Sequence, residues 1–199
     1  MAFARGRGFG LAVEKSLVRR ECRANPPFYL PMNSLPDSTR FVLMHTSHAG
    51  NVGAAARAIK VMGFGDLVLV RPRFADVLSR EETIAMAGGA GDIRARARCV
   101  DSQDEALQGM QHVCATAMTP RDFGPPTFAP REHFASLRDS AAAVAFVFGS
   151  ERFGMSNDEV YRCHACLSIP TDARYGSLNL AQAVQLIAYE WRQALGGFD

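Results

Sequence analysis

The stretch that decides the fold is residues 41–70, FVLMHTSHAGNVGAAARAIKVMGFGDLVLV. It opens with a short apolar run, FVLMH at 41–45, which predicts a buried strand. The chain then passes through a turn containing glycine and asparagine into GAAARAIKVMG at 53–63. From Val52, just before this stretch, apolar residues recur at helical spacing: Val52, Ala55, Ala56, Ile59 and Met62. Gly63 predicts the end of this helix, and LVLV at 67–70 predicts a second strand. The stretch therefore predicts a strand–helix–strand unit.

Three apolar runs further along the chain predict more strands, with helical segments between them. They are HVCAT at 112–116, AFVFG at 145–149 and CLSIP at 166–170. Near-continuous apolar strands that alternate with helices are typical of an α/β fold with a parallel sheet covered by helices on both faces. Ligands of such sheets bind beyond the carboxyl ends of the strands. The loops after His45, Thr116, Phe148 and Ile169 are therefore candidates for a site.

The last predicted helix, LNLAQAVQLIAYEWRQAL at 178–195, carries one apolar stripe. Its members are Leu180, Val184, Ile187 and Trp191. A stripe of this kind packs on the core, forms a dimer face, or does both.

Composition places the chain among globular proteins of one domain. It has 199 residues, of which 48% are hydrophobic and 21% charged, enough to bury a sizeable core. No apolar run approaches the roughly 20 residues that span a bilayer, and the N-terminus lacks the pattern of a signal peptide. We therefore expect no membrane association and a cytoplasmic location.

Charge and periodicity divide the chain near residue 38. The net charge is only +2, but residues 1–40 hold seven Lys/Arg against three Asp/Glu, and the first 38 or so show no sustained period. We expect residues 1–38 to be a basic, disordered extension and residues 39–199 to be the folded domain. The extension is either an arm that contacts RNA or an N-terminus set too early, with Met32 as the natural start.

The five cysteines are scattered and odd in number, which favours reduced, buried thiols over a disulfide framework. Cys163 and Cys166 form one Cys-x-x-Cys pair with His164 between them. A zinc site would need a second pair, and a redox site would need the pair to open a helix after a strand. The sequence therefore predicts no metal.

Residues 143–156, AVAFVFGSERFGMS, come close to the phosphate-binding loop G-x-x-x-x-G-K-[ST]. Met155 stands where the lysine should be, and Glu151 inside the loop would repel a phosphate, so a nucleotide-hydrolysing loop is disfavoured. The loop suits a cationic ligand, or one with N–H and hydroxyl donors, because Gly149 and Gly154 allow close approach and Glu151 accepts hydrogen bonds. The alternative is an ordinary turn between strand and helix with a surface glutamate.

Two other loops add to this pattern. In TDARYGSLNLAQAV, residues 171–184, Gly176 allows a sharp turn and Ser177 is placed to cap a helix that begins near Leu178. In the loop TSHAGNVGAAARAIK, Arg57 projects from the first two turns of a helix, where the helix dipole and a guanidinium together suit an RNA phosphate. Each feature has a plainer alternative, a simple helix cap and a solvated arginine.

Taken together, three segments resemble, in order and spacing, the motifs of the SPOUT class of RNA 2'-O-ribose methyltransferases. The segments are NVGAAARA at 51–58, FVFGSERFGMSNDEV at 146–160 and SIPTDARYGSLNLAQAV at 168–184. The resemblance is nearest to the TrmJ-like branch of the TrmH family and covers about residues 40–195. Each motif is weak alone, whereas the ordered triple is specific.

This resemblance implies a fold and a cofactor. The family has an α/β domain whose C-terminal part forms a deep trefoil knot, a rare exception to the rule against knots. S-adenosyl-L-methionine binds in the knot, and its positive sulfonium agrees with the charge of the middle loop. Carried over to this chain, the cofactor-binding residues are Thr116, Ala117, Met118, Gly149, Glu151, Ile169, Gly176, Ser177, Leu178 and Asn179.

The resemblance also implies methyl transfer to RNA, with Arg57 and Asn51 as the catalytic candidates. A ribose 2'-hydroxyl is a weak nucleophile that must lose its proton as it attacks the methyl carbon. Because arginine stays protonated, Arg57 is expected to orient the ribose and stabilise charge, with a phosphate accepting the proton. The implied substrate is tRNA, at a cytidine or uridine ribose of the anticodon loop, and the implied enzyme is a homodimer that needs no metal.

Two departures from the family pattern bear on these expectations. Close relatives tend to have serine where this chain has Gly176, and the TrmJ-like branch continues into a C-terminal extension that assists tRNA binding. Here the chain stops at Asp199, so it is either truncated or relies on the core dimer alone. The alternatives are an rRNA 2'-O-ribose methyltransferase and a non-catalytic RNA-binding member of the same fold. The joint presence of Asn51, Arg57 and Glu151 argues against the second.

Overall fold

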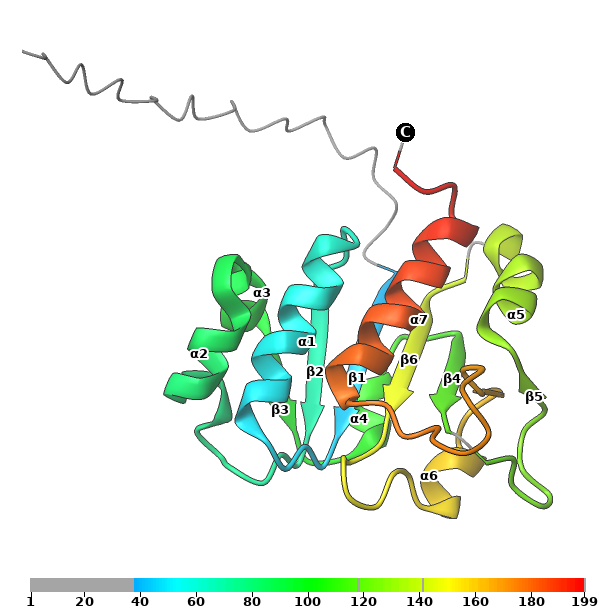
Figure 1. Ribbon diagram of the computed structural model, residues 1–199, viewed down its shortest axis with the longest axis horizontal. Coiled ribbons are helices and arrows are strands. Elements are labelled where there is room, and N and C mark those ends of the chain that lie inside the picture. Colours follow the sequence, from blue (N-terminus) through cyan, green and yellow to red (C-terminus); the bar gives the residue numbers. More distant parts are fainter. Residues whose placement is uncertain (1–37, 118, 141, 199) are drawn as a thin grey trace, which may run out of the picture. The chain divides into compact units, whose positions relative to one another are not determined.

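The chain folds around one seven-stranded sheet in which neighbouring strands are parallel (Figure 1). The computed structural model describes residues 38–117, 119–140 and 142–198. The strand order is β3-β2-β1-β6-β4-β7-β5. The strands are β1 Thr39–Met44, β2 Asp66–Val70, β3 Arg98–Val100, β4 His112–Thr116, β5 Thr127–Phe128, β6 Val144–Phe148 and β7 Ala165–Leu167. The predicted α/β fold with a parallel sheet is confirmed.

Helices cover both faces of this sheet. They are α1 Ala49–Val61, α2 Glu81–Ala87, α3 Gly91–Arg96, α4 Gln103–Leu107, α5 Pro130–Leu137, α6 Asn157–Tyr161 and α7 Leu180–Ala194, with short 3-10 helices η1 Val77–Ser79, η2 Gly88–Ala90 and η3 Arg138–Ser140. Side chains of α1, α5 and α7 pack in one apolar cluster with one face of the strands, the near face in Figure 1. Side chains of α4 and α6 pack in a second cluster on the other face.

The strands are apolar along their whole length because both faces are buried. In β1, Phe41 and Leu43 belong to the cluster with α1 and α7, whereas Val42 and Met44 belong to the cluster with α4 and α6. Each of these side chains is at most 1% exposed. Successive side chains of a strand point to opposite faces, so a strand covered on both sides needs an unbroken apolar run. That run is the pattern that predicted the sheet.

The predicted strand–helix–strand unit is confirmed, but α1 begins at Ala49 rather than at Gly53. Gly50 and Asn51 belong to the first turn of the helix instead of the turn before it. His48 is the N-cap, with an extended backbone and no side-chain cap bond, and its carbonyl accepts the N–H of Asn51 at 3.1 Å. Glycine and asparagine are weak helix formers, so local propensity placed the start too late.

Helix α1 packs closely on α2 through Gly53. A Cβ at position 53 would lie 2.1 Å from the carbonyl oxygen of Thr83 and 2.8 Å from the nitrogen of Ala87. Thr83 is buried, and its hydroxyl lies 2.9 Å from the carbonyl oxygen of Ala49 and 2.6 Å from that of Val77. This contact holds the N-terminal half of α1 against α2.

Helix α7 begins at Leu180, and the prediction that Ser177 caps it is wrong. The cap is Asn179, whose Oδ1 accepts the N–H of Ala181 at 2.9 Å, while Gln182 Oε1 accepts the N–H of Asn179 at 3.2 Å. The predicted apolar stripe lies in the core; its members are Leu180, Val184, Ile187 and Trp191. Its alternative role as a dimer face stays a prediction.

The other differences concern short strands. β7 ends at Leu167 rather than at Pro170, and β3 and β5 were not predicted. These strands have three, three and two residues, which is too short for periodicity to reveal. Proline also lacks the N–H that a continued strand would donate.

Residues 1–37, and Cys22 within them, lie outside the described residues, so the N-terminal extension stays a prediction. The trefoil knot also stays a prediction. Among the described residues, no helix combines the length and the apolar character that crossing a bilayer requires.

Candidate functional site

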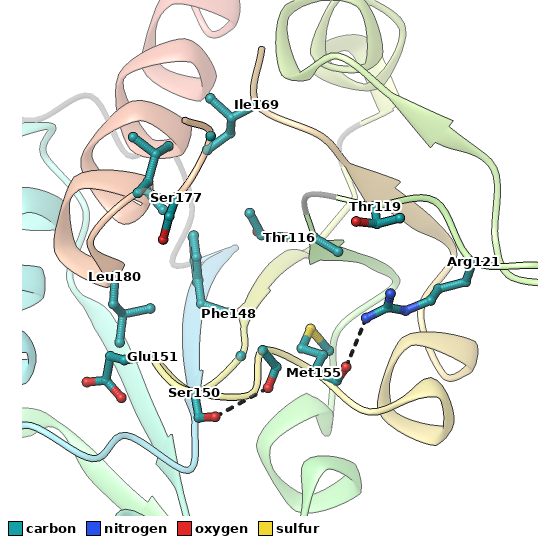
Figure 2. A pocket seen from close by; sticks show the side chains of 16 residues that line it. Thr116, Thr119, Arg121, Phe148, Ser150, Glu151, Met155, Ile169, Ser177 and Leu180 are labelled. Atoms are coloured by element: carbon teal, nitrogen blue, oxygen red, sulfur yellow. Dashed lines mark hydrogen bonds between the residues drawn. The ribbon is translucent and has the colours of Figure 1, made fainter. Parts of the chain in front are cut away.

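Three adjacent parallel strands end at one edge of the sheet, and a cavity of about 270 Å³ lies beyond them (Figure 2). The strands are β6, β4 and β7, which end at Phe148, Thr116 and Leu167. The cavity is lined by Thr116, Ala117, Thr119, Arg121, Phe148, Gly149, Ser150, Glu151, Gly154, Met155, Ile169, Gly176, Ser177, Leu178, Leu180 and Ala183. This is the edge at which ligands of parallel sheets bind.

The loop after β6 closes on itself and needs a glycine at position 149. A Cβ there would lie 2.2 Å from the carbonyl carbon of Gly154 and 2.4 Å from the nitrogen of Met155. Ser150 and Gly154 exchange backbone hydrogen bonds of 3.0 and 2.9 Å, and Gly154 has a φ of +65°, which favours glycine. The space left by Gly149 is therefore taken by the loop itself rather than by a ligand.

Glu151 ties this loop to the loop after β1. Its Oε2 accepts the N–H and the hydroxyl of Ser47, both at 2.8 Å. Its Oε1 accepts the side-chain amide of Asn51 at 2.8 Å and the N–H of His48 at 3.3 Å. The loops meet because β1 and β6 are neighbours in the sheet. A carboxylate has room for about four hydrogen bonds, so these donors occupy it fully.

The same hydrogen bonds keep Glu151 charged. Burial by itself would raise the pKa of this carboxyl, but the hydrogen bonds from Asn51 and Ser47 outweigh burial, and the pKa of Glu151 is lowered. A ligand in the cavity therefore meets the negative charge of Glu151 rather than a free acceptor. The main structural effect of Glu151 is to position the loop after β1.

Asn51 links that loop to the start of α7. Its Nδ2 donates to Glu151, and its Oδ1 accepts Nδ2 of Asn179 at 3.0 Å. Asn179 in turn caps α7. Residues from the three sequence motifs are thus joined by one chain of hydrogen bonds.

A second, wider cavity of about 740 Å³ lies next to the first. The two share Glu151, Ser177, Leu178 and Leu180 as lining residues. The second cavity is further lined by polar and basic side chains, among them His48, Asn51, Arg73, Arg80 and Tyr175. A small cavity and a wide one therefore meet at a common wall.

Most of the predicted cofactor residues line the first cavity: Thr116, Ala117, Gly149, Glu151, Ile169, Gly176, Ser177 and Leu178. Asn179 lines the second cavity instead, together with Asn51. Met118 lies outside the described residues. Arg57 lines neither cavity; it is exposed on α1, with its guanidinium near Gly88 and no hydrogen bond to another described residue.

Several lining residues were not among the predicted cofactor residues. Thr119 and Arg121 lie in the loop after β4, which the sequence analysis named as a candidate for the site. A polar and a basic residue just after the end of a strand could therefore have been predicted as site residues. Leu180 and Ala183 offered no such signal, because their place in the wall depends on how α7 packs across the sheet.

The wall of the first cavity fits a ligand with polar groups. Thr116 Oγ1 and Arg121 Nε are buried and have no hydrogen-bond partner among the described residues. Buried polar atoms are almost always hydrogen-bonded, so we expect a ligand bound in the cavity to supply the hydrogen-bond partners of these two atoms. Phe148, Ile169 and Leu180 add apolar surface that suits a ring. A nucleoside cofactor such as S-adenosyl-L-methionine combines both features.

One group of side chains among the described residues is compact enough to share a metal ion: the ligand atoms of His112, Cys114 and His133 lie within 4.8 Å of one another. It lies at the start of β4, at the opposite end of the strand from Thr116. Nε2 of His112 and Nε2 of His133 are 3.0 Å apart, and burial lowers the pKa of both histidines. A hydrogen bond between neutral imidazoles accounts for this pair. The expected absence of a metal stays a prediction.

The remaining cysteines agree with the expectation of reduced thiols. Among the described residues Cys99, Cys114, Cys163 and Cys166 are free, and all but Cys99 are buried. Burial raises the pKa of Cys163 to about 12, which leaves it an inert thiol at neutral pH.

Comparison with known proteins shows the family of the chain. Residues 38–189 match the SpoU rRNA Methylase family. The tRNA (cytidine/uridine-2'-O-)-methyltransferase TrmJ of Pectobacterium atrosepticum is 46% identical over 160 residues, which are 79% of this chain and 65% of that protein. The chain thus spans somewhat less than two thirds of the length of this relative.

Solved structures show the same similarity. A probable methyltransferase from Bordetella pertussis Tohama I is 45% identical with a TM-score of 0.74, over 79% of this chain and 96% of that one. TrmJ from Z. mobilis ZM4 is 33% identical with a TM-score of 0.73, over 78% of this chain and 68% of that one.

Proposed function

The chain belongs to the SpoU rRNA methylase family, as its three sequence motifs predicted, and from this premise we propose that it transfers a methyl group from S-adenosyl-L-methionine to a ribose 2'-hydroxyl of tRNA. Membership of a methylase family implies a methyl donor. That the donor is S-adenosyl-L-methionine, and that the target is a cytidine or uridine of the anticodon loop, are parts of the proposal. The name of the relative from Pectobacterium atrosepticum supports a pyrimidine ribose of tRNA.

The shared wall of the two cavities carries the proposal. Group transfer requires two ligands with their reacting atoms held about 3–3.5 Å apart. A donor in the 270 Å³ cavity and a ribose in the 740 Å³ cavity would meet at Glu151, Ser177 and Leu178. Arg73 and Arg80 line the wider cavity beside Glu82 and Glu151, and their guanidinium groups are the donors there that suit an RNA phosphate.

The residues of the site divide between the two ligands. When bound, S-adenosyl-L-methionine supplies an electrophilic methyl group on a positive sulfonium. The loops that contain Thr116, Gly149 and Ser177 hold it, and the charge of Glu151 favours a cation nearby. Asn51, fixed by Glu151 and Asn179, presents its side chain to the wider cavity and positions the ribose there.

Arg57 engages the RNA from outside these cavities. Its guanidinium is exposed and has no hydrogen bond to another described residue, which leaves its donors available for a phosphate and the target ribose. Because Arg57 lines neither cavity of its own chain, we propose that the enzyme works as a homodimer in which each active site draws on both copies.

The direct test is methyl transfer with labelled S-adenosyl-L-methionine and total tRNA from a strain that lacks the enzyme. Label should appear in alkali-resistant dinucleotides, because a 2'-O-methyl group blocks alkaline cleavage. We expect Arg57→Ala to lower the rate by about 100-fold or more, the scale of losing a transition-state contact, while its affinity for S-adenosyl-L-methionine stays within about twofold.

Arg138→Ala is the matched control, because Arg138 is an exposed arginine that lines neither cavity. It should transfer methyl groups at the normal rate. Loss of donor binding in Arg57→Ala would contradict the role given to Arg57. Label in rRNA but not in tRNA would move the substrate to rRNA, and no label in either RNA would leave a non-catalytic RNA-binding protein.

A further inference from the structure

Arg121 has an unusual position in the first cavity. It follows β4 in the chain and lines the cavity, and its guanidinium points toward Met155 (Figure 2). One nitrogen, Nη2, donates to the carbonyl oxygen of Met155 at 3.2 Å. Nε is buried and has no partner among the described residues. An arginine has five N–H donors, so most of this fork remains available.

The charged groups of this cavity are few and lie apart. Among the described residues that line it, Arg121 is the only cation and Glu151 the only anion. They lie at opposite sides of the cavity in Figure 2. The acceptors of Glu151 are occupied by the loop after β1, whereas Arg121 still has donors to offer. The open charged group of the cavity is therefore a donor fork, which selects an anion.

We propose that Arg121 binds the α-carboxylate of the methyl donor and so sets the direction in which the donor lies. This inference rests on the proposed function. S-adenosyl-L-methionine has one anionic group, its carboxylate, while its sulfonium and ammonium groups are positive and are repelled by a guanidinium. Arginine and carboxylate form paired, charge-assisted hydrogen bonds. With the carboxylate at Arg121, the apolar side chains of Phe148, Ile169 and Leu180 receive the adenine ring.

Thr116 supports the same placement. Its buried Oγ1 has no partner among the described residues, and it lies at the end of β4, from which the loop to Arg121 departs. A hydroxyl donates as well as accepts, so Thr116 serves a bound carboxylate or ammonium group. The amino-acid part of the donor would then supply hydrogen-bond partners for both Thr116 Oγ1 and Arg121 Nε, which have none among the described residues.

The test compares two ligands that differ only in the carboxylate. Isothermal titration calorimetry measures the affinity of the full chain for S-adenosyl-L-methionine and for decarboxylated S-adenosylmethionine. Hydrogen bonds to charged groups contribute enough binding free energy to change the affinity for the ligand by about 10- to 100-fold. We expect the wild-type protein to bind the carboxylated ligand tighter by that factor. In Arg121→Gln this preference should vanish, because only the carboxylated ligand loses affinity.

Arg121→Gln removes the charge and the fork but keeps a polar side chain, and its melting temperature checks that loss of the bond to the carbonyl of Met155 leaves the fold intact. Arg121→Lys keeps the charge without the fork and should retain part of the preference. Equal losses for both ligands would show a structural role and overturn the inference. Normal affinity for both ligands with weaker tRNA binding would assign Arg121 to an RNA phosphate, and would also overturn it. Wild-type protein that binds neither ligand would overturn the proposed function itself.

Discussion

Replacement of Glu151 by glutamine tests whether this side chain holds two loops together. The carboxylate accepts four hydrogen bonds from Ser47, His48 and Asn51. An amide offers only one oxygen and turns an NH₂ group toward the other donors, so two of the contacts are lost in either orientation. Hydrogen bonds to charged groups contribute about 1.5–3 kcal/mol each, and partial exposure of the loop lowers that figure. We expect Glu151→Gln to lower the free energy of unfolding by about 2–3 kcal/mol.

Urea unfolding followed by circular dichroism measures this loss, and the melting temperature should fall by about 5–10 °C for a domain of this size. Glu190→Gln is the matched control. It removes the same charge but breaks an ion pair whose partner, Arg131, is 81% exposed. Such pairs contribute about 0.2–1 kcal/mol. Hydrogen exchange at the amides of Ser47 and His48 should become faster in Glu151→Gln only.

The difference between wild type and Glu151→Gln also depends on pH. Because hydrogen bonds lower the pKa of Glu151 below its ordinary value of 4.5, its stabilisation is complete above that pH and is lost as the pH falls through the folded-state value. The variant has no such titration, so the two stabilities should converge in acid. Equal losses for Glu151→Gln and Glu190→Gln at pH 7 would refute the reasoning, as would a difference that persists in acid.

Two further predictions concern packing and pH. Gly53→Ala should lower the free energy of unfolding by more than about 2 kcal/mol, because its Cβ would lie 2.1 Å from the carbonyl oxygen of Thr83. Gly50→Ala is the control and should change the free energy of unfolding little, because the nearest atom to its Cβ is 3.5 Å away. Similar urea midpoints for the two variants would contradict this packing. Burial lowers the pKa of His112 and of His133, so near pH 6.5 the unfolded chain binds protons at these histidines that the folded protein does not bind. Stability should therefore fall as the pH drops through 6.5, by at most about 1.4 kcal/mol per pH unit for each histidine, and His133→Gln should reduce that slope in thermal melts at graded pH.

Local patterns in the sequence were sufficient for the architecture and for the edge where the site lies. Apolar runs predicted β1, β2, β4 and β6 because a strand covered on both faces leaves the same signal wherever it sits in the sheet. The charge of Glu151 and the missing lysine were likewise enough to argue against a phosphate loop. The start of α1 and the cap of α7 were misplaced, because tertiary hydrogen bonds hold Asn51 and Asn179 where propensity alone favours a turn.

The sequence by itself thus determined the α/β class, the order of the motifs and the family they resemble. Only the tertiary structure decided which residues meet. Glu151 binds Ser47 across 104 positions of sequence because β6 lies beside β1, and Arg121 reaches the cavity because β4 lies between β6 and β7. Periodicity reports how deeply a strand is buried and not which strand lies next to it. Strand order depends on the packing of the whole sheet, so the partners of Glu151 and the place of Arg121 could not be read from the residues around them.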